Sequence, residues 1–250
     1  RRAVAVAVVG LWWGAAAACA SEMSGRVQLD GPRPEPVEIP VVEKSPKYPV
    51  EGCGTSKRSP RLVVSIDGGV ANAVVWLQAP ADSQAPPVAA TMDQQACEFV
   101  PHVMLVPRGS TVTIGNSDSI VHNLRIFREA QMLMHEWQQP APQPNTIPWR
   151  FDEAGRFLVR CGVHAWMSAW VIVAEHPYYA LSDPEGNFTI PQVPPGAYTL
   201  QVWHEALGEQ QQSVVVNHDT GPMTIRFAEQ RPSAHRARHS AAALMAAASE

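Results

Sequence analysis

Short apolar runs that alternate with polar residues, and that end at glycine or proline, recur along most of this chain of 250 residues. Residues 25–31 and 61–67 are runs of this kind, and residues 72–78 form a more continuous apolar run that is typical of a buried strand. The chain also contains 23 prolines, which are poorly tolerated inside helices. The pattern therefore predicts an all-β protein built from many short strands.

The middle of the chain continues this pattern with four further strands. Residues 102–116 predict two strands around a Pro-Arg-Gly turn, and residues 157–161 and 169–175 predict two more, separated by a very short loop. Residues 129–148 instead predict a loop that crosses between sheets, with a helical turn at 130–137 as the alternative. This arrangement is typical of a sandwich of two sheets.

After Pro177 the turns follow each other more closely. An Asp-Pro-Glu-Gly turn and a Pro-Pro-Gly turn separate three strands, which predicts a compact β meander over 177–228. The meander is too short for a complete sandwich, so we expect strands from the N-terminal half of the chain to complete its sheets. Residues 229–250 mix basic residues with many alanines and have no apolar period, which predicts a disordered, mobile tail.

The first 20 residues have the pattern of an export signal. Arg1 and Arg2 precede an apolar run, and small residues follow it. That run is shorter than the roughly 20 residues of a permanent membrane helix. Cys19, in the stretch AAAC, leaves two alternatives: ordinary cleavage beside it, or a lipobox in which a lipid on Cys19 attaches the protein to a membrane. Both alternatives predict a periplasmic or extracellular protein, lipid-anchored in the second case.

The balance of charges excludes one class of partner. The formal net charge of the chain is −4. A nucleic-acid-binding protein has to neutralise many phosphates with basic side chains. The mildly acidic balance therefore argues against a nucleic-acid partner.

A cluster of metal-binding side chains lies in the very short loop between the last two strands of the predicted sandwich. Cys161, His164 and Met167 follow each other at intervals of three residues. His122 follows another predicted strand and a short polar loop, which brings it to the same end of the sandwich. A thiolate, two imidazoles and a weak axial thioether commonly hold copper as it changes between Cu(I) and Cu(II). The four residues therefore predict a site for one copper ion.

The residues around these ligands resemble those of the cupredoxins, the family of small blue copper proteins that includes plastocyanin and amicyanin. The resemblance covers roughly residues 90–175, and it rests on Gly109, Val112, Asn116, Asp118, His122, Asn123, Cys161, His164 and Met167. It implies a cupredoxin-like Greek-key β-sandwich, a type 1 copper site and electron transfer. It also implies that Asn123 links the two ligand loops. Hydrogen bonds from residues next to the ligands orient those ligands and tune the metal.

The meander carries a second resemblance, to the regulatory-like β-sandwich domain associated with carboxypeptidases. It rests on the Asp-x-x-Gly-x-Phe and Val-Pro-Pro-Gly-x-Tyr turns, and it implies a binding or structural accessory without protease activity. The predicted order along the chain is a signal segment at 1–20, an N-terminal β extension at 21–90, the cupredoxin copper-binding domain at 91–176, the meander as an appended small β-sandwich at 177–228, and the tail at 229–250.

Export also sets the expected state of the remaining cysteines. An exported protein matures in an oxidising compartment, where thiols pair. With Cys161 assigned to copper, Cys53 and Cys97 remain, and we expect them to form a disulfide that links the extension to the copper domain. His102 follows a proline at the start of a predicted strand, and we expect it to be structural or a weak second metal site.

Copper sites with these ligands occur in three functional classes. The leading class is a one-electron carrier that exchanges electrons through an exposed histidine edge with a redox protein partner, a cytochrome or a membrane or periplasmic oxidoreductase. The alternative is a periplasmic copper-binding or copper-handling protein without a dedicated electron-transfer role. A copper enzyme normally needs a second copper centre or an open coordination position, and the sequence has no separate histidine cluster to supply one. We therefore predict a copper protein that is not an enzyme.

Overall fold

The computed structural model describes residues 21–43, 45, 47–79, 84–140, 145–217 and 219–228. The regular structure in these residues consists of β-strands, so the predicted all-β fold class is confirmed. The same residues contain no helix that is long and apolar enough to cross a membrane. The predicted signal segment at 1–20, which includes Cys19, and the predicted tail at 229–250 lie outside the described residues.

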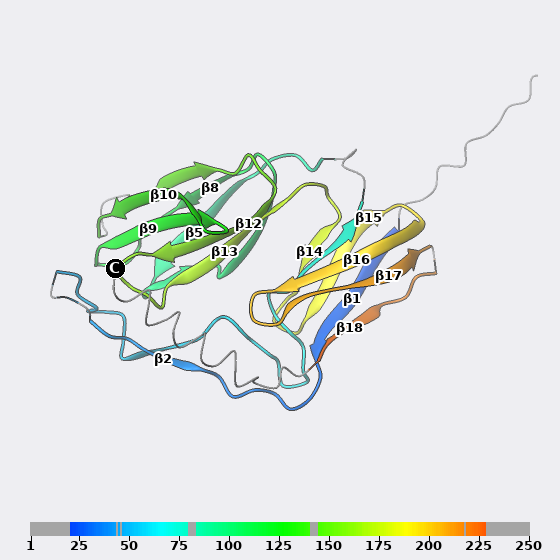
Figure 1. Cartoon of the computed structure of the whole chain (residues 1–250), viewed down its shortest axis with the longest axis horizontal. Helices are drawn as coiled ribbons and strands as arrows, with labels where there is room; N and C mark the ends of the chain where they lie inside the picture. The colour runs from blue at the N-terminus through cyan, green and yellow to red at the C-terminus, as the bar shows by residue number, and fades with distance from the viewer. Residues whose placement is uncertain are drawn as a thin grey trace, which may run out of the picture.

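Two β-sandwiches lie side by side in the described part of the chain (Figure 1). In the first sandwich, one sheet has the strand order β10 (Gln131–Gln138), β9 (His122–Arg128), β12 (Gly155–Cys161), β13 (Ser168–Ala174) and β7 (Val103–Pro107). The facing sheet has the order β11 (Ile147–Arg150), β8 (Thr111–Ile114), β5 (Ala89–Gln95) and β6 (Glu98–Val100). The parallel pairs β13–β7 and β5–β8 show that the chain crosses between the sheets, as it does in Greek-key sandwiches.

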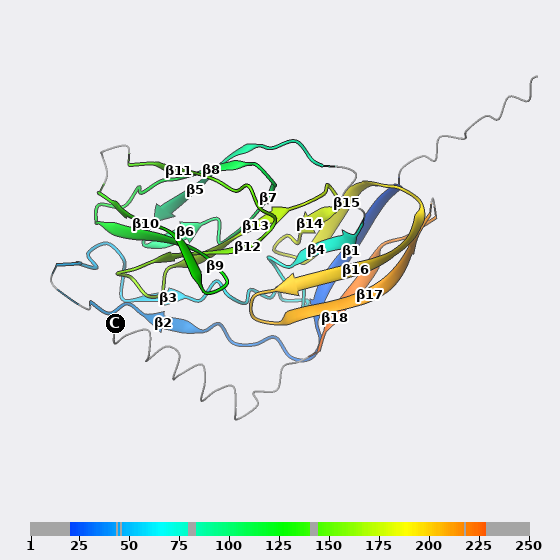
Figure 2. The same ribbon diagram turned by 45° about the horizontal axis from the view of Figure 1, so that its top comes forward.

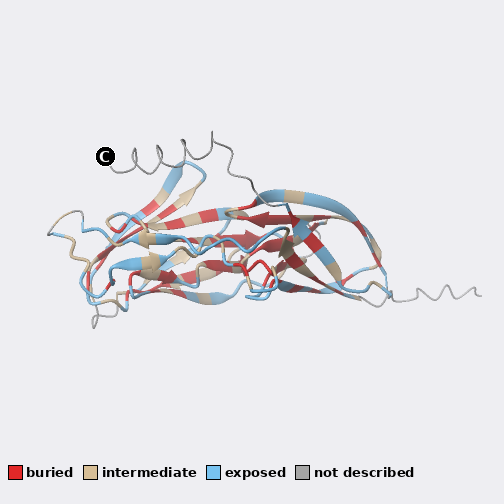
Figure 3. Cartoon of the chain, turned by 90° about the horizontal axis from the view of Figure 1, so that it is seen from below, coloured by how far each residue is buried: buried red, intermediate tan, exposed pale blue. Residues whose placement is uncertain are grey.

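The core of the first sandwich forms because alternate residues of the two sheets face each other. Along β12, Phe157, Val159 and Cys161 are buried, while the residues between them are at least partly exposed. Figure 3 shows the same alternation of buried and exposed positions along other strands. The core cluster extends to Cys161 and Met167. The predicted metal ligands therefore lie at one end of a packed apolar core.

The second sandwich combines strands from both ends of the described chain. One sheet has the order β15 (Asn187–Val193), β1 (Ser21–Leu29) and β18 (Met223–Phe227), and the other has the order β14 (Tyr179–Leu181), β4 (Val74–Gln78), β16 (Gly196–His204) and β17 (Gly208–Val216). The N-terminal strands β1 and β4 pair with the strands of the meander, so the expectation that such strands complete its sheets is confirmed. The first sandwich is therefore an insertion between β4 and β14.

A small apolar cluster joins the two sandwiches. On β4, Val75 and Leu77 face the core of the second sandwich, while Val74 lies in the junction with Val103 and Ile172 of the first. This strand is buried on both faces, as its continuous apolar run predicts. The junction fixes the two sandwiches against each other through packed side chains.

The segment between β1 and β4 contains a small hairpin, which Figure 2 shows beside the first sandwich. Its strands are β2 (Glu38–Pro40) and β3 (Ser56–Arg58), which pair antiparallel. We call residues 38–43, 45 and 47–58 the N-terminal hairpin. Within it, Cys53 forms a disulfide with Cys97, which lies in the turn between β5 and β6. This is the pair expected from the sequence.

The stretch expected to be a crossing loop forms two strands instead. Residues 129–148 contain all of β10 and the start of β11, and no helical turn forms at the described positions of 130–137. β10 is the edge strand of its sheet, and its register with β9 shifts between Met132 and Met134. Such a bulge interrupts the strict alternation by which a strand is identified in a sequence. The strand could therefore not be identified from its pattern alone.

Candidate metal centre

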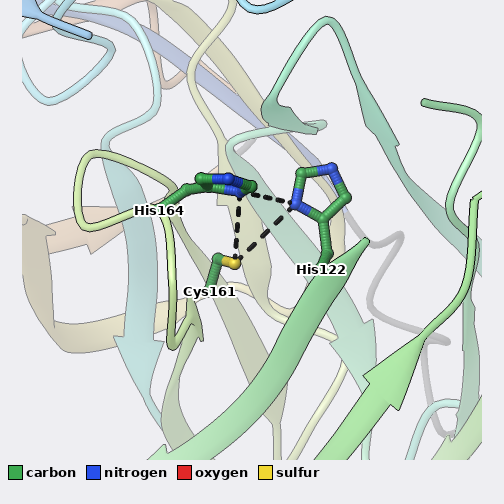
Figure 4. Close-up of side chains that lie close together, drawn as sticks. All are labelled: His122, Cys161 and His164. Atoms are coloured by element: carbon green, nitrogen blue, oxygen red, sulfur yellow. Dashed lines mark hydrogen bonds between the residues drawn. The ribbon is translucent and has the colours of Figure 1, made fainter. Parts of the chain in front are cut away.

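The side chains of His122, Cys161 and His164 point toward one another at one end of the first sandwich (Figure 4). His122 begins β9, and Cys161 ends β12. These two strands are antiparallel neighbours in which Cys161 pairs with Leu124, so the start of one strand lies beside the end of the other. His164 lies in the short loop between β12 and β13. The strand pairing therefore brings distant parts of the sequence to one point.

The three donor atoms form a compact triangle. Nδ1 of His122 lies 3.0 Å from Nδ1 of His164, and Sγ of Cys161 lies 3.7 Å and 3.8 Å from these two nitrogens. Metal bonds to imidazole nitrogen and thiolate sulfur are roughly 2.0–2.3 Å long, so atoms bound to one ion at roughly 90–120° lie about 3–4 Å apart. The triangle has these separations. The residues present therefore fit one metal ion.

The surroundings of Cys161 favour the thiolate, which is the form of cysteine that binds metals. Burial alone raises the pKa of this thiol, but hydrogen bonds with His122, His164 and the backbone of Asn123 lower the pKa to about 5. The N–H of Asn123 donates to Sγ at 3.4 Å. At neutral pH the cysteine therefore presents a negative sulfur to the two imidazoles.

Asp118 fixes the orientation of His122. Its carboxylate lies 2.9 Å from Nε2 of His122, and it also accepts the backbone N–H of Cys97 at 2.8 Å. An ionised carboxylate only accepts hydrogen bonds, so Nε2 donates its proton to Asp118, and Nδ1 is the nitrogen that faces Cys161 and His164. Burial alone lowers the pKa of His122, but Asp118 and Cys161 raise it above its usual value. Burial raises the pKa of Asp118, but the hydrogen bonds from His122 and Cys97 lower it overall.

Asn123 connects β9 to the ligand loop through its backbone. Its carbonyl accepts the N–H of Gly162 at 2.8 Å, and its own N–H donates to Sγ of Cys161. The side-chain oxygen of Asn123 accepts a hydrogen bond from Nε of Arg125 at 2.8 Å. Asn123 thus contacts Cys161 and Gly162 through its own backbone atoms, while its amide side chain binds Arg125.

Met167 is buried at the end of the ligand loop. Its N–H donates to the carbonyl of His164 at 3.0 Å, and its carbonyl accepts the N–H of Cys161 at 3.2 Å. These bonds close a tight loop from Cys161 to Met167, and the side chain of Met167 belongs to the apolar core cluster. Its role as the axial copper ligand stays a prediction.

Both imidazoles of the centre are buried, in contrast to the exposed histidine edge expected of the leading functional class. The exposed fraction is 0% for His122 and 1% for His164. Nε2 of His164 is buried and has no hydrogen-bond partner among the described residues. The local spacing of the ligands gives no sign of this, because burial depends on which distant segments pack over them.

His102 lies outside the metal centre. Its Nδ1 lies 2.9 Å from the carbonyl oxygen of Ser168, and its Nε2 contacts the carboxylate of Glu205. Glu205 also accepts a hydrogen bond from Nε1 of Trp170 at 3.0 Å and pairs with Arg61. Both ring nitrogens of His102 are thus engaged by protein groups at the junction of the sandwiches, which is a structural arrangement.

The sequence did not indicate that Asp118, Cys97 and Trp166 are linked to one another beside the centre. Asp118 belongs to the cupredoxin-like pattern, and its spacing of four residues from His122 was the available signal. The backbone of Cys97 binds Asp118, and its carbonyl accepts a hydrogen bond from Nε1 of Trp166 at 3.0 Å. These contacts depend on how a separate turn is placed, which residue spacing does not show.

Solved structures similar to this chain include several copper proteins. A purple cupredoxin from Nitrosopumilus maritimus is 23% identical over 34% of this chain and 99% of its own, with a TM-score of 0.30. Amicyanin from Paracoccus versutus is 20% identical over 39% of this chain and 86% of its own, with a TM-score of 0.31. A copper-containing nitrite reductase from Thermus scotoductus is 19% identical over 39% of this chain and 25% of its own, with a TM-score of 0.30.

A family model described as domain II of polysaccharide lyase family 4 matches residues 161–222. This range begins at the ligand loop and includes most of the C-terminal strands of the second sandwich. It is not the carboxypeptidase regulatory-like domain expected at 177–228, which stays a prediction. No curated protein matches the chain. Similarities of this extent assign neither a family nor a function to the chain.

Proposed function

We propose that this chain binds one copper ion through His122, Cys161 and His164, with Met167 as a weak fourth ligand, and that it carries single electrons. The observation that supports this most is the triangle formed by one thiolate sulfur and two imidazole nitrogens, with separations of 3.0, 3.7 and 3.8 Å. Thiolate and imidazole ligands together suit copper in both of its common oxidation states.

Copper, when held by these residues, would accept or release one electron at this site. The residues of the chain keep the ligands in place during that change. Asp118 holds Nε2 of His122, the N–H of Asn123 binds the sulfur, and backbone bonds close the loop between Cys161 and Met167. Ligands that are held in place by hydrogen bonds from neighbouring residues do not need to rearrange when the charge of the ion changes. This rigidity is what a one-electron carrier requires.

The visible spectrum of the copper-loaded protein tests this proposal. We expect one equivalent of Cu(II) to produce an intense blue band from charge transfer between the thiolate and copper. The variant Cys161→Ser should lose that band. The matched control is His135→Ala, since His135 is an exposed histidine on β10 outside the donor triangle, and this variant should keep the band. A colourless copper complex of the unmodified protein, or a blue band that persists in Cys161→Ser, would contradict the proposal.

A second candidate is a copper-binding or copper-handling protein without a dedicated electron-transfer role. The burial of His164, with an exposed fraction of 1%, favours it, because a carrier benefits from a ligand edge that its partner can approach. The two candidates use the same ligands. A carrier releases only an electron from the site, whereas a copper-handling protein releases the copper ion itself. Voltammetry with a Cu(I) chelator in solution separates them. A reversible one-electron wave with copper retained supports the carrier, and loss of copper after each reduction supports handling.

We also propose that the protein acts outside the cytoplasm, in the periplasm or the extracellular space. The charged, apolar and small-residue order of residues 1–20 supports export, and Cys19 supports attachment through a lipid. A cytochrome or another exported or membrane-bound oxidoreductase is the class of redox partner that fits this location. If the lipid is present, Cys19→Ala should move the protein from the membrane fraction to the soluble fraction.

A further inference from the structure

The N-terminal hairpin is held at both sides of the end of the first sandwich that carries the metal centre. On one side, the ring of Tyr48 stacks on Trp137 of β10, with 5.5 Å between the ring centroids. On the other side, Nζ of Lys57 donates to the carbonyl of Ala96, in the turn between β5 and β6. β10 and β6 belong to opposite sheets. The hairpin therefore spans this end of the sandwich from one sheet to the other.

The disulfide holds the middle of the hairpin in the same place. Cys53 is buried, and both it and Cys97 belong to the core cluster that contains Cys161. Val41 and Val50, also in the hairpin, pack against this cluster. The hairpin is thus fixed to the metal end of the sandwich by a covalent bond and by apolar contacts.

Cys97 also holds both ligand-bearing segments through its backbone. Its N–H donates to Asp118, whose carboxylate binds His122. Its carbonyl accepts the indole N–H of Trp166, which lies in the ligand loop two residues after His164. One residue of the disulfide therefore connects the hairpin to the segments that position both imidazoles.

The buried edge of His164 lies beside these contacts. The ring of Trp166 is 5.1 Å from the ring of His164, between centroids. Trp166 also lines a cavity of about 210 Å³ together with Ile39 and Lys57 of the hairpin. The hairpin and the ligand loop thus face each other across a small space, and Nε2 of His164 is shielded from solvent without a protein partner.

We infer that the N-terminal hairpin is a cover, locked by the disulfide between Cys53 and Cys97, that closes the imidazole face of the metal centre. The closure is a property of the metal-free chain, and its consequence for copper rests on the proposed function. Copper can enter or leave the centre only when the hairpin moves away from the ligand loop. The cover therefore slows the exchange of copper and retains an ion that has been bound.

Chemical modification of the metal-free protein tests the closure without reference to copper. Diethyl pyrocarbonate modifies accessible neutral imidazoles, and peptide mapping by mass spectrometry reports each histidine separately. We expect His164 to react at least tenfold more slowly than the exposed His135. In the double variant Cys53→Ser/Cys97→Ser, the rate at His164 should rise at least tenfold, while the rate at His135 stays the same. Equal rates at the two histidines in the unmodified protein would overturn the inference.

A milder variant keeps the test decisive if the double variant does not fold. Trp166→Phe retains an aromatic ring but removes the hydrogen bond to the carbonyl of Cys97. We expect it to keep the disulfide and to raise the rate of modification at His164 two- to fivefold. An unchanged rate at His164 in this variant, and in the double variant where that one is folded, would show that the hairpin does not control access.

The rate at which a Cu(I) chelator, bicinchoninate, removes copper then tests the consequence. We expect removal to be at least tenfold faster from the double variant, and two- to fivefold faster from Trp166→Phe, than from the unmodified protein. Equal removal rates, together with the expected difference in histidine modification, would show that the cover exists but does not govern copper exchange. Failure of the protein to bind copper would contradict the proposed function and leave the modification result unaffected.

Discussion

Each of the two sandwiches contains a fully buried histidine, and the surroundings of the two differ in chemistry. In the first sandwich, His122 is 0% exposed and contacts Asp118 and the thiol of Cys161. In the second, His204 is 2% exposed, and its Nδ1 accepts the backbone N–H of Ala206. Burial is therefore the same in the two regions, and the partners are different.

The difference appears in the charge that each imidazole favours. Burial lowers the pKa of both rings, because a charged imidazolium is poorly solvated in a protein interior. For His122, the hydrogen bonds with Asp118 and Cys161 outweigh burial and raise the pKa. For His204, burial dominates and lowers the pKa to about 4. In the first sandwich the buried imidazole of His122 therefore has two anionic partners, Asp118 and Cys161, whereas the shift of His204 in the second is dominated by burial.

Removing one histidine from each region gives the largest expected contrast. We expect His122→Ala to weaken copper binding more than the roughly 10–100-fold typical for loss of a group that only supports a ligand. His204→Ala should leave copper binding unchanged in the folded protein, because His204 lies in the second sandwich. Competition with a chelator of known copper affinity measures both variants. Equal weakening in both would show that the loss reflects general damage to the fold.

Neutralising Asp118 tests a residue that orients the ligand His122 and does not itself bind the metal. Asp118→Asn keeps the size of the side chain but removes the anionic acceptor that holds Nε2 of His122. We expect copper affinity to fall about 10–100-fold, with the blue band retained at saturating copper. Asp183→Asn is a matched control, since Asp183 lies in a surface turn of the second sandwich. An affinity equal to that of the control would remove Asp118 from the proposed site.

The buried histidine of the second sandwich predicts a loss of stability in acid. Its pKa of about 4 in the folded chain lies below its ordinary value of 6.5, so the unfolded chain binds more protons between these values. The contribution of His204 to stability is therefore complete above pH 6.5 and decreases as the pH falls toward 4. We expect it to lose about 2 kcal/mol between pH 7.5 and pH 5.

The variant His204→Gln isolates this contribution, because a glutamine side chain does not titrate in this range and can still accept a hydrogen bond. Denaturant unfolding at pH 7.5 and pH 5 should show a smaller pH-dependent loss in the variant than in the unmodified protein. His176 is also a buried histidine with a lowered pKa, so part of the pH dependence should remain. An identical pH dependence in the two proteins would contradict the assignment to His204.

The smallest expected effect concerns the fourth predicted ligand. Met167→Leu keeps an apolar side chain of similar volume in the core cluster but removes the thioether sulfur. A weak axial ligand tunes a copper site more than it holds the ion. We expect the variant to keep copper and the blue band and to shift the reduction potential upward, as measured by voltammetry. An unchanged potential would indicate that Met167 only fills the core.

The features that could be predicted from the sequence are those marked by a pattern among residues that are close together in the chain. Gly and Pro turns and apolar alternation marked β1, β4, β7, β8, β12, β13 and the strands β14 to β16 of the meander, but residues 61–67, also predicted as a strand, form only an isolated bridge between Val64 and Val70. The spacing of Cys161, His164 and Met167 marked one loop as a candidate site. The strand β10 was missed because its alternation is broken by a bulge between Met132 and Met134. The burial of His164 was missed because it depends on the packing of segments that are distant in the sequence, which no local pattern records.

The insertion of the first sandwich into the second has a consequence for the order in which the protein assembles. β1 pairs in parallel with β18, with Gly25 opposite Met223. At a synthesis rate of about 5–20 residues per second, β1 waits roughly 10–40 s for this partner strand to be made. The first sandwich, from Ala89 to Ala174, is continuous in the chain and can fold during that interval. The N-terminal hairpin is made before it, so the metal centre and its cover can form while β1 and β4 still lack the partner strands that complete the second sandwich.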